Sequence, residues 1–331
     1  MTPFIIAELS ANHCKSLDIA SDLVRAAADA GANAIKLQTF TPQSMVADEN
    51  YIITDGTWKG LRLIDLYHDA HTPWDWHEYL FELAESLNID AFSSVYDREG
   101  VDFLESIDCP MYKISSFEVP DLALIRYVAS KGKPVIVSTG MATYGEIQAI
   151  MRIANEMRVK FTLMKCTSAY PATPSDANLI TLQDMSRYFH CDMGLSDHTL
   201  GSATACVAMA MGATVFEKHL ILDRTYPSPD RGFSSNPAEF KQYVRDIHDA
   251  YQAIGNIHYG PTNSEKPSHL LRRSLYFAHD IDEGVMLHRN DFRTARPAEG
   301  VPPEQLPLFM GRFTAFRVKA GQPVTWDVTR E

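Results

Sequence analysis

Short apolar runs alternate with amphipathic stretches along most of the chain. Eight runs predict buried strands, at 4–7, 34–37, 90–93, 111–114, 134–137, 161–164, 193–195 and 214–216. Each run is followed by apolar residues at helical spacing, at 17–30, 76–87, 99–107, 121–130, 144–157, 179–189, 203–211 and 237–254. Eight such units in about 255 residues are typical of an α/β fold, the (β/α)8 TIM barrel. A doubly wound open sheet is the alternative, but no GxGxxG motif follows the first run.

Two regions depart from this rhythm. Residues 41–73 form a long connection rich in polar and aromatic residues, and a connection of that length in a compact domain usually has a function. Near the C-terminus, residues 312–328 predict two strands about an Ala320–Gly321 turn. We therefore expect a TIM-barrel catalytic domain at 1–258, a linker at 259–270 and a small C-terminal domain at 271–331.

The charge and the cysteines narrow the class of protein. A net charge of −12 argues against a nucleic-acid partner and against an anionic membrane surface. The five cysteines are odd in number and form no CxxC pair, which favours a reducing compartment. The start of the chain has neither a basic region nor a long apolar run, so we expect no signal peptide, no membrane span and a cytoplasmic location.

Polar residues collect at the C-terminal ends of the predicted strands, where barrel enzymes place their active sites. Side-chain alternation along a strand must send some of them away from the mouth. Lys36 and Lys113, together with serines, predict a cationic pocket for a phosphate or carboxylate anion. A single lysine in such a place is more often a solvated surface charge, and it is the joint placement of these residues that indicates a binding pocket. The candidates are Glu8, Lys36, Gln38, Ser93, Ser94, Lys113, Ser115, Ser116, Ser138, Thr139, Lys165, Thr167, Ser168, Ser196, His198, Glu217, Lys218 and His219.

Two histidines stand at matched positions after the last two strands. The strands at 193–195 and 214–216 are joined by a helix, so they should lie parallel. Neighbouring strands are about 4.8 Å apart. His198 and His219 would then leave the same edge side by side, and two imidazoles so placed can share a metal ion. The alternative is a pair of unrelated polar loop residues.

Seven motifs, in this order, resemble the sialic acid synthase family. They are AELSANH (7–13), IKLQTF (35–40), YKISSFE (112–118), STGMAT (138–143), KCTSAYP (165–171), GLSDHTLG (194–201) and EKH (217–219). The resemblance covers nearly the whole chain, and the tail resembles the antifreeze-like (SAF) domain of these enzymes. Residues 55–77 and Ser168 are more similar to the pseudaminic acid synthase branch than to the N-acetylneuraminate branch.

The resemblance implies an enzyme that condenses phosphoenolpyruvate with an N-acetylated amino sugar. His198 and His219 would be catalytic and would hold a divalent metal, usually Mn²⁺, with Mg²⁺ or Co²⁺ as alternatives. A domain-swapped homodimer would bring the tail of one subunit over the mouth of the other. Phosphoenolpyruvate would be held by Lys36, Ser94, Lys113, Ser116, Ser138, Ser168 and Ser196, and the sugar by Glu8, Gln38, Tyr170, Asp230 and Arg296.

Glu118 is a further catalytic candidate, because attack by C3 of phosphoenolpyruvate leaves a cationic C2 that needs a nearby carboxylate. The alternative role for Glu118 is a contact to a sugar hydroxyl. Two departures from the family pattern put the sugar contacts in question. Ser228 and Arg231 stand in PSPDRG where members often have PGPDH, and RPAEG replaces the commoner RPGxG around Arg296.

The expected reaction joins phosphoenolpyruvate, 2,4-diacetamido-2,4,6-trideoxy-L-altrose and water to give pseudaminic acid and phosphate. Synthesis of N-acetylneuraminic or legionaminic acid is an alternative within the family. A second alternative among enzymes is a metal-dependent pyruvate aldolase, which releases no phosphate. A Schiff-base aldolase using Lys113 or Lys165 is weaker, since that lysine should lack an anionic partner. The alternative of another class is a non-catalytic sugar-binding protein.

Overall fold

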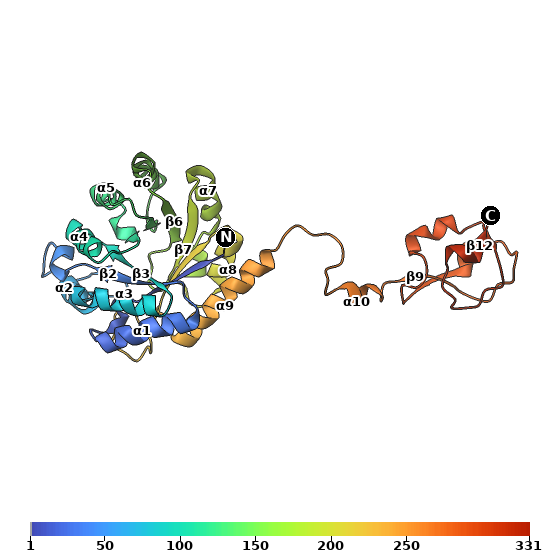
Figure 1. Ribbon diagram of the computed structural model, residues 1–331, viewed down its shortest axis with the longest axis horizontal. Coiled ribbons are helices and arrows are strands. Elements are labelled where there is room, and N and C mark those ends of the chain that lie inside the picture. The colour runs from blue at the N-terminus through green and yellow to red at the C-terminus, as the bar shows by residue number, and fades with distance from the viewer. Residues whose placement is uncertain (1) are drawn as a thin grey trace. The chain divides into compact units, whose positions relative to one another are not determined.

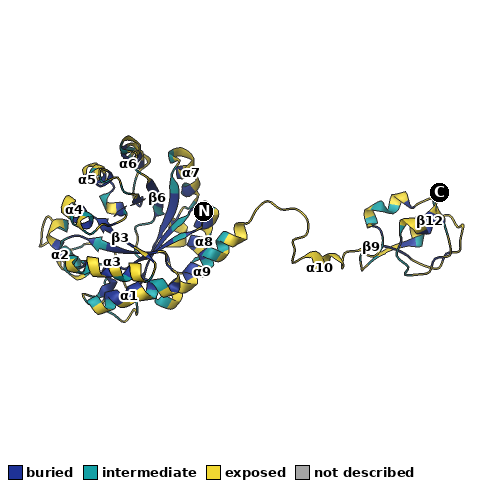
Figure 2. Ribbon diagram, viewed as in Figure 1, coloured by how far each residue is buried: buried dark blue, intermediate teal, exposed yellow. Residues whose placement is uncertain are grey.

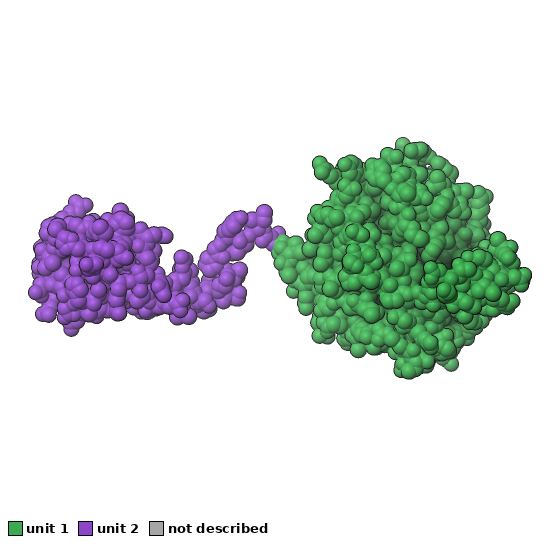
Figure 3. Space-filling model, turned by 180° about the vertical axis from the view of Figure 1, so that it is seen from behind, with its two compact units in different colours: residues 1–255 green, residues 256–331 purple. Residues whose placement is uncertain are grey.

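The computed structural model describes residues 2–331, which divide into two compact units at Gly255 and Asn256 (Figure 3). The first unit is a closed barrel of eight parallel strands, each hydrogen-bonded to the next, with β8 paired to β1 (Figure 1). This confirms the predicted TIM barrel. The strands are β1 (Phe4–Glu8), β2 (Ala34–Thr39), β3 (Asp90–Val95), β4 (Tyr112–Ile114), β5 (Val135–Ser138), β6 (Phe161–Cys166), β7 (Asp192–Asp197) and β8 (Val215–His219).

Helices surround the barrel and turn their apolar faces to the strands. Buried side chains gather on the strands and on the inner helix faces, and exposed ones on the outer helix faces (Figure 2). Local sequence fixes the helix ends: Ser16 caps the first helix and Gly31 ends it at φ +91°, which glycine adopts without strain. The helices after the eight strands are α1 (Leu17–Ala30), α3 (His77–Ser86), α4 (Arg98–Ser106), α5 (Leu122–Ala129), α6 (Tyr144–Met157), α7 (Ile180–Phe189), α8 (Ala203–Ala210) and α9 (Pro237–Ile254).

Several strands run past their last apolar residue into polar sequence. β1 includes Glu8, β2 continues to Thr39 and β8 ends at His219. The ladder continues there because backbone N–H and C=O groups need partners whatever the side chain is. The register sets Glu8 beside Lys36 on one side and beside His219 on the other. The polar strand ends are therefore rigid parts of the sheet.

The long connection at 41–73 contains regular structure that the sequence analysis did not predict. A 3-10 turn covers Pro42–Met45, and the helix α2 covers Leu63–Ala70. Between them, residues 51–63 fold back on themselves, with the Ile53 amide donating to Leu61 O at 2.9 Å and the Leu63 amide donating to Tyr51 O at 3.0 Å. The segment is thus an ordered insertion between β2 and α3.

The second unit has a small apolar core of its own, which includes Leu275, Phe277 and Phe309. The two strands predicted about the Ala320–Gly321 turn are wrong. The strand at 329–330 pairs instead with the strand at 313–314. Pro323 forms an isolated bridge with Tyr276 of the strand at 274–277, and Val318 forms one with Ile281 in the loop that follows it. The elements of this unit are α10 (Lys266–His269), β9 (Ser274–Phe277), β10 (Phe292–Ala295), β11 (Phe313–Thr314) and β12 (Thr329–Arg330).

We expect the barrel to lose stability in mild acid through His77. This histidine accepts from Thr39 Oγ1 through Nε2 at 2.8 Å, with Nδ1 3.2 Å from Pro73 O, and burial lowers its pKa from 6.5 to about 4. Between these values the unfolded chain binds a proton that the folded chain does not bind. Stability therefore falls as the pH drops below 6.5, by about 2 kcal/mol at pH 5.

Urea unfolding of the wild type and of His77→Gln at pH 7 and pH 5 measures this contribution. The pH-dependent loss of unfolding free energy should be smaller by about 2 kcal/mol in the variant. His190→Gln is the matched control, because His190 is exposed. An equal loss in the wild type and in His77→Gln would show that His77 does not carry the effect.

Candidate active site

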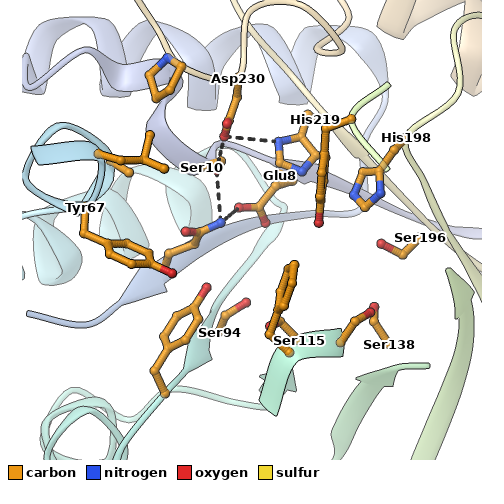
Figure 4. A pocket seen from close by; sticks show the side chains of 18 of the residues that line it. Glu8, Ser10, Tyr67, Ser94, Ser115, Ser138, Ser196, His198, His219 and Asp230 are labelled. Atoms are coloured by element: carbon orange, nitrogen blue, oxygen red, sulfur yellow. Dashed lines mark hydrogen bonds and ion pairs between the residues drawn. The ribbon is translucent and has the colours of Figure 1, made fainter. Parts of the chain in front are cut away.

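A cavity of about 380 Å³ lies at the C-terminal ends of the barrel strands. It brings together residues from every strand or from the turn that follows it, although they are far apart in the sequence (Figure 4). Of the residues predicted to bind substrate or metal, Ser168 and Arg296 are not among those lining it, and Arg296 belongs to the second unit. The strand-end candidates that do not line it either are Ser93, Thr139, Lys165, Thr167 and Lys218. The predicted residues that line it are Glu8, Lys36, Gln38, Ser94, Lys113, Ser115, Ser116, Glu118, Ser138, Tyr170, Ser196, His198, Glu217, His219 and Asp230.

As expected from side-chain alternation, some polar residues at the strand ends face the cavity and others lie outside the barrel. Ser93 lies outside the barrel, where its hydroxyl meets Thr39 Oγ1 at 2.6 Å. Lys218 also lies outside, with Nζ 3.0 Å from Asp197 Oδ2 and over the ring of Tyr243. Glu217 and His219, one position to either side of Lys218, face the cavity. The period of two along each strand thus separates binding groups from structural ones.

Two lysines and two carboxylates form a buried cluster on the cavity floor. Lys113 Nζ lies 2.6 Å from Glu217 Oε2, and Lys36 Nζ lies 3.8 Å from Glu217 Oε1. Lys36 also forms an ion pair with Glu8 and donates to Ser94 Oγ at 2.9 Å. None of the four charged side chains is more than 5% exposed. A second anion could displace part of this network because the amines already point into the cavity.

The two carboxylates of the cluster differ in proton affinity. Burial raises the pKa of Glu8 to about 7, in spite of Lys36. Burial also opposes ionisation of Glu217, but Lys113 and Lys36 outweigh it and lower its pKa to about 2. Glu217 is therefore a fixed negative charge, while Glu8 can hold a proton near neutral pH.

His198 and His219 lie side by side at the mouth, with ring centroids 5.4 Å apart. His198 Nδ1 lies 3.0 Å from the carbonyl oxygen of Thr167, so the proton on Nδ1 leaves a lone pair on Nε2. His219 Nδ1 is buried without a hydrogen-bond partner and lies 3.8 Å from Asp230 Oδ2. Burial, then the neighbouring His198, holds the pKa of His219 well below its usual value and keeps it neutral.

These residues fit a divalent metal. Two adjacent imidazoles are suitable ligands once each offers a lone pair, and the Thr167 carbonyl fixes the orientation of His198. Within residues 2–331, no group of three or more His, Cys, Asp or Glu side chains could hold a metal by itself. The remaining positions would therefore be filled by water or substrate oxygens, as in catalytic metal sites that keep open positions.

A hydrogen-bonded chain of polar groups runs from Glu8 to Asp230, which lies beside His219. Gln38 Nε2 donates to Glu8 Oε1 and to Ser10 Oγ, both at 3.0 Å, and Ser10 Oγ donates to Asp230 Oδ2 at 2.5 Å (Figure 4). The Tyr170 ring lies 4.4 Å from that of His198. This chain offers the mixture of donors and acceptors that a polyhydroxylated ligand requires.

Glu118 faces the cavity from the turn after β4. Burial raises its pKa above the usual value, although a hydrogen bond from Ser115 opposes the shift. The carboxyl group is thus poorly solvated and close to the floor cluster. Such a carboxylate stabilises a cation that develops beside it more strongly than one in water would.

Comparison with known proteins now adds to this geometry. The model of the NeuB family matches residues 23–259, and the SAF domain model matches residues 272–327.

The chain belongs to the NeuB family.

Its relatives include the pseudaminic acid synthase of Helicobacter pylori, 38% identical over 98% of this chain and 97% of the relative. The pseudaminic acid synthase of Campylobacter jejuni subsp. jejuni serotype O:2 is 39% identical over 96% of this chain and 94% of the relative. Among solved structures, the N-acetylneuraminic acid synthetase from Leptospira borgpetersenii serovar Hardjo-bovis, in complex with citrate, has a TM-score of 0.74 and 29% identity, covering 81% of this chain and 90% of that one.

The departures from the common NeuB family pattern have a structural explanation. Ser228 is buried, donates to Asn12 Oδ1 at 2.6 Å and accepts from the Asp230 amide at 3.1 Å. It therefore supports the loop that presents Asp230 to the cavity. Arg231 is exposed and is not among the residues that line the cavity. Neither substitution removes a polar group from the cavity wall.

Sequence reasoning assigned no role to several residues that line the cavity. Glu217 was recognised as a strand-end residue, yet its position between Lys36 of β2 and Lys113 of β4 depends on closure of the barrel, which no local pattern indicates. Ser10 lies within the motif AELSANH, but nothing in the motif indicates its bond to Asp230. Phe233 packs against the His219 ring with centroids 4.9 Å apart and has no sequence signal beyond its apolar character.

Ser168 lies beside the cavity and meets it through Gly140. A Cβ atom on Gly140 would lie 2.2 Å from Ser168 Oγ and 2.7 Å from Ser116 Oγ. Both hydroxyls therefore occupy the space that any side chain at position 140 would need. The Gly140 amide donates to Ser116 Oγ at 3.0 Å. This arrangement positions two hydroxyl donors for an anion, and only glycine leaves room for them.

We therefore expect Gly140→Ala to weaken anion binding without unfolding the barrel. Both hydroxyls must rotate away from the new methyl group, which should raise the KM for phosphoenolpyruvate about tenfold, as expected for roughly 1.4 kcal/mol of lost hydrogen bonding. Gly145→Ala is the matched control, because nothing lies within 4 Å of a Cβ at that position. A KM as low in Gly140→Ala as in the control would contradict this arrangement.

None of the helices in residues 2–331 is both long and apolar enough to cross a membrane.

Proposed function

We propose that this chain is a pseudaminic acid synthase. It would condense phosphoenolpyruvate with 2,4-diacetamido-2,4,6-trideoxy-L-altrose and water, giving pseudaminic acid and phosphate. The observation that carries the proposal is that one cavity holds both a buried lysine–serine pocket and a pair of adjacent histidines. The two relatives named pseudaminic acid synthase support the choice of sugar.

The floor of the cavity would bind phosphoenolpyruvate. Lys36 and Lys113 supply two buried amines for its phosphate and carboxylate. Ser138 Oγ is buried without a hydrogen-bond partner, so it has a donor ready for a ligand oxygen. Ser94, Ser116, Ser168 and Ser196 surround these groups or border them. Fixing both substrates in this way can contribute about 7–11 kcal/mol to lowering the barrier.

His198 and His219 would hold the divalent metal, for which we propose Mn²⁺. When bound, the metal supplies Lewis-acid polarisation of the open-chain aldehyde. The histidines face the polar chain formed by Glu8, Gln38 and Asp230, so the sugar hydroxyls would be oriented from that side.

The new carbon–carbon bond forms between C3 of phosphoenolpyruvate and the aldehyde carbon. C2 then carries positive charge, which the Glu118 carboxylate would stabilise from the cavity wall. Water adds to C2, and the C–O bond to phosphate breaks, so that phosphate leaves with the bonding electrons. Loss of phosphate makes the condensation favourable overall.

Release of phosphate tests the proposal. The enzyme is supplied with phosphoenolpyruvate, Mn²⁺ and either the trideoxy-altrose or N-acetylmannosamine, with a chelator control. Release with the first sugar alone, lost on chelation, is the expected result. Release with N-acetylmannosamine instead would make the enzyme an N-acetylneuraminate synthase. Release with neither sugar would leave the substrate unknown and would reopen the alternative of a non-catalytic sugar-binding protein.

The homodimer and the role of Arg296 stay predictions of the family resemblance. If Arg296 reaches the sugar from the partner subunit, Arg296→Ala should raise the KM for the sugar about tenfold or more, because a charged hydrogen bond contributes about 1.5–3 kcal/mol. The KM for phosphoenolpyruvate should stay unchanged. Light scattering gives the oligomeric state independently, and a monomer with an unaltered sugar KM in Arg296→Ala would refute the prediction.

A cytoplasmic location is likewise proposed. All five cysteines are free, which suits a reducing compartment. Fractionation of the source cells, followed by detection of the protein with an antibody, tests the location directly.

A further inference from the structure

The helix α2 turns an apolar stripe toward the cavity. Leu63, Leu66, Tyr67 and Ala70 stand at positions i, i+3, i+4 and i+7 and therefore share one face of the helix. All four line the cavity. They are only partly buried, whereas Ile64 is the buried residue of this helix. The stripe thus faces an accessible space instead of the protein core.

The rest of the insertion has the same character. Met45, Tyr51, Ile53 and Trp58 also line the cavity, so the lining from residues 41–73 is entirely apolar or aromatic. The charged side chains of this segment do not line it. Arg62, which immediately precedes α2, is held in a bidentate pair by Asp65, with both contacts at 2.7 Å. We call this set of residues, from Met45 to Ala70, the apolar wall.

The apolar wall is fixed to the barrel by contacts near its tip. Trp58 Nε1 donates to Pro229 O at 3.1 Å, and its ring lies 5.3 Å from that of Tyr170. Thr57 Oγ1 donates to the Tyr170 carbonyl. At the other end of the wall, the Tyr67 ring packs on Phe40 at 5.5 Å. The wall therefore has a defined position relative to the polar strand ends.

The cavity is consequently divided by polarity. Figure 4 shows Tyr67 across the cavity from His198, with Glu8 between them. The charged floor and the histidines suit the reacting groups, namely the anion and the aldehyde. The end of the sugar that lies away from the aldehyde must then meet the apolar wall, where a methyl group is favoured. A hydroxyl group there loses water and finds few polar side-chain atoms, chiefly the Tyr51 and Tyr67 hydroxyls.

We propose that the apolar wall selects sugars by the substituent at C6, with Leu63 and Leu66 as specificity-determining residues. This inference rests on the proposed function and deepens it. The wall accepts the C6 methyl group of a 6-deoxy sugar and the methyl groups of acetamido substituents. It disfavours a 6-hydroxyl, and it rejects a 6-phosphate, because no cationic side chain among residues 41–73 faces the cavity.

Three sugars that differ only at C6 test the proposal. They are 2,4-diacetamido-2,4,6-trideoxy-L-altrose, its 6-hydroxy analogue and the 6-phosphate of that analogue. Phosphate release gives kcat/KM for each sugar. The wild type should prefer the 6-deoxy sugar over the 6-hydroxy sugar about 10- to 100-fold, the range that an apolar pocket achieves, and should show no measurable turnover of the 6-phosphate.

Leu66→Asn and Leu63→Asn should each narrow the 6-deoxy to 6-hydroxy ratio about tenfold while the KM for phosphoenolpyruvate stays unchanged. Both sugars are measured on the same preparation, so the ratio does not depend on the fraction of folded enzyme. Asp69→Asn is the matched control on the exposed side of α2, where Asp69 pairs with Lys15 at 3.3 Å, and it should leave the ratio unaltered.

The failure of this inference and the failure of the proposed function are distinguishable. If the wild type releases phosphate with the 6-deoxy sugar but shows a ratio near one, or a ratio that both leucine variants leave unchanged, the apolar wall does not select at C6 and the synthase function stands. If the wild type releases phosphate with none of the sugars, the proposed function falls, and the inference falls with it.

Discussion

Replacement of His198 by alanine should lower kcat/KM by more than about 10²-fold and should abolish tight binding of Mn²⁺. The reason is geometric: within residues 2–331, no third His, Cys, Asp or Glu side chain joins His198 and His219 in a group that could hold a metal ion. Removing one of two imidazoles therefore leaves a single protein ligand. Phosphate release measures the first effect, and equilibrium dialysis with Mn²⁺ alone measures the second without depending on turnover.

A suitable control for this variant is His258→Ala, because His258 is exposed and lies outside the barrel unit. It should bind metal and turn over as the wild type does. Normal turnover and unchanged Mn²⁺ affinity in His198→Ala would falsify the assignment of the paired histidines as the metal site. Normal Mn²⁺ affinity together with lost turnover would show that His198 acts in catalysis without binding the metal.

Replacement of Lys113 by methionine should have the second large effect, on activity and stability together. The amine is 2% exposed and lies 2.6 Å from Glu217, whose side chain is 5% exposed. Its loss leaves Glu217 with Lys36 at 3.8 Å as its remaining amine partner. Breaking a buried pair on one side costs about 3–5 kcal/mol, because a buried charge is left uncompensated. Activity should fall at the same time, since an anion-binding amine is gone.

The double variant Lys113→Met/Glu217→Gln separates the two effects. With both charges removed, at least half of the lost unfolding free energy should return, as measured by urea denaturation. Turnover should stay low, because the amine that meets the substrate anion is still absent. A double variant no more stable than Lys113→Met would show that the ion pair is not the source of the loss. Recovery of turnover would show that Lys113 does not bind substrate.

The sequence was sufficient to predict the barrel because its signal is repeated. Each strand–helix unit carries an apolar run and a helical period, and Ser16 and Gly31 mark the ends of α1 as cap residues should. The strand ends were less accurate. Glu8 and His219 look like loop residues by polarity, but the parallel ladder includes them because their backbones find partners in the neighbouring strands.

The candidate site could be predicted as far as strand-end chemistry allows. Lys36 and Lys113 were recognisable because each is a charged residue near the C-terminal end of an apolar run, and the fold brings such ends together. The bond between Ser10 and Asp230 was not predictable, since 220 positions separate these residues and the contact depends on how two loops meet. The helix α2 was missed because its short apolar stripe faces a cavity, within a segment that is otherwise polar.

The apolar wall has a consequence for how new products can arise in this family. It is encoded by one uninterrupted run between the end of β2 at Thr39 and the start of α3 at His77, whereas the lysines, the catalytic carboxylate and the paired histidines lie outside that run. Recombination within this single stretch of the gene would change which sugar is accepted. It would leave unchanged the residues proposed to bind phosphoenolpyruvate and to form the new bond. The range of accepted sugars can therefore change through one continuous segment while the rest of the barrel is kept.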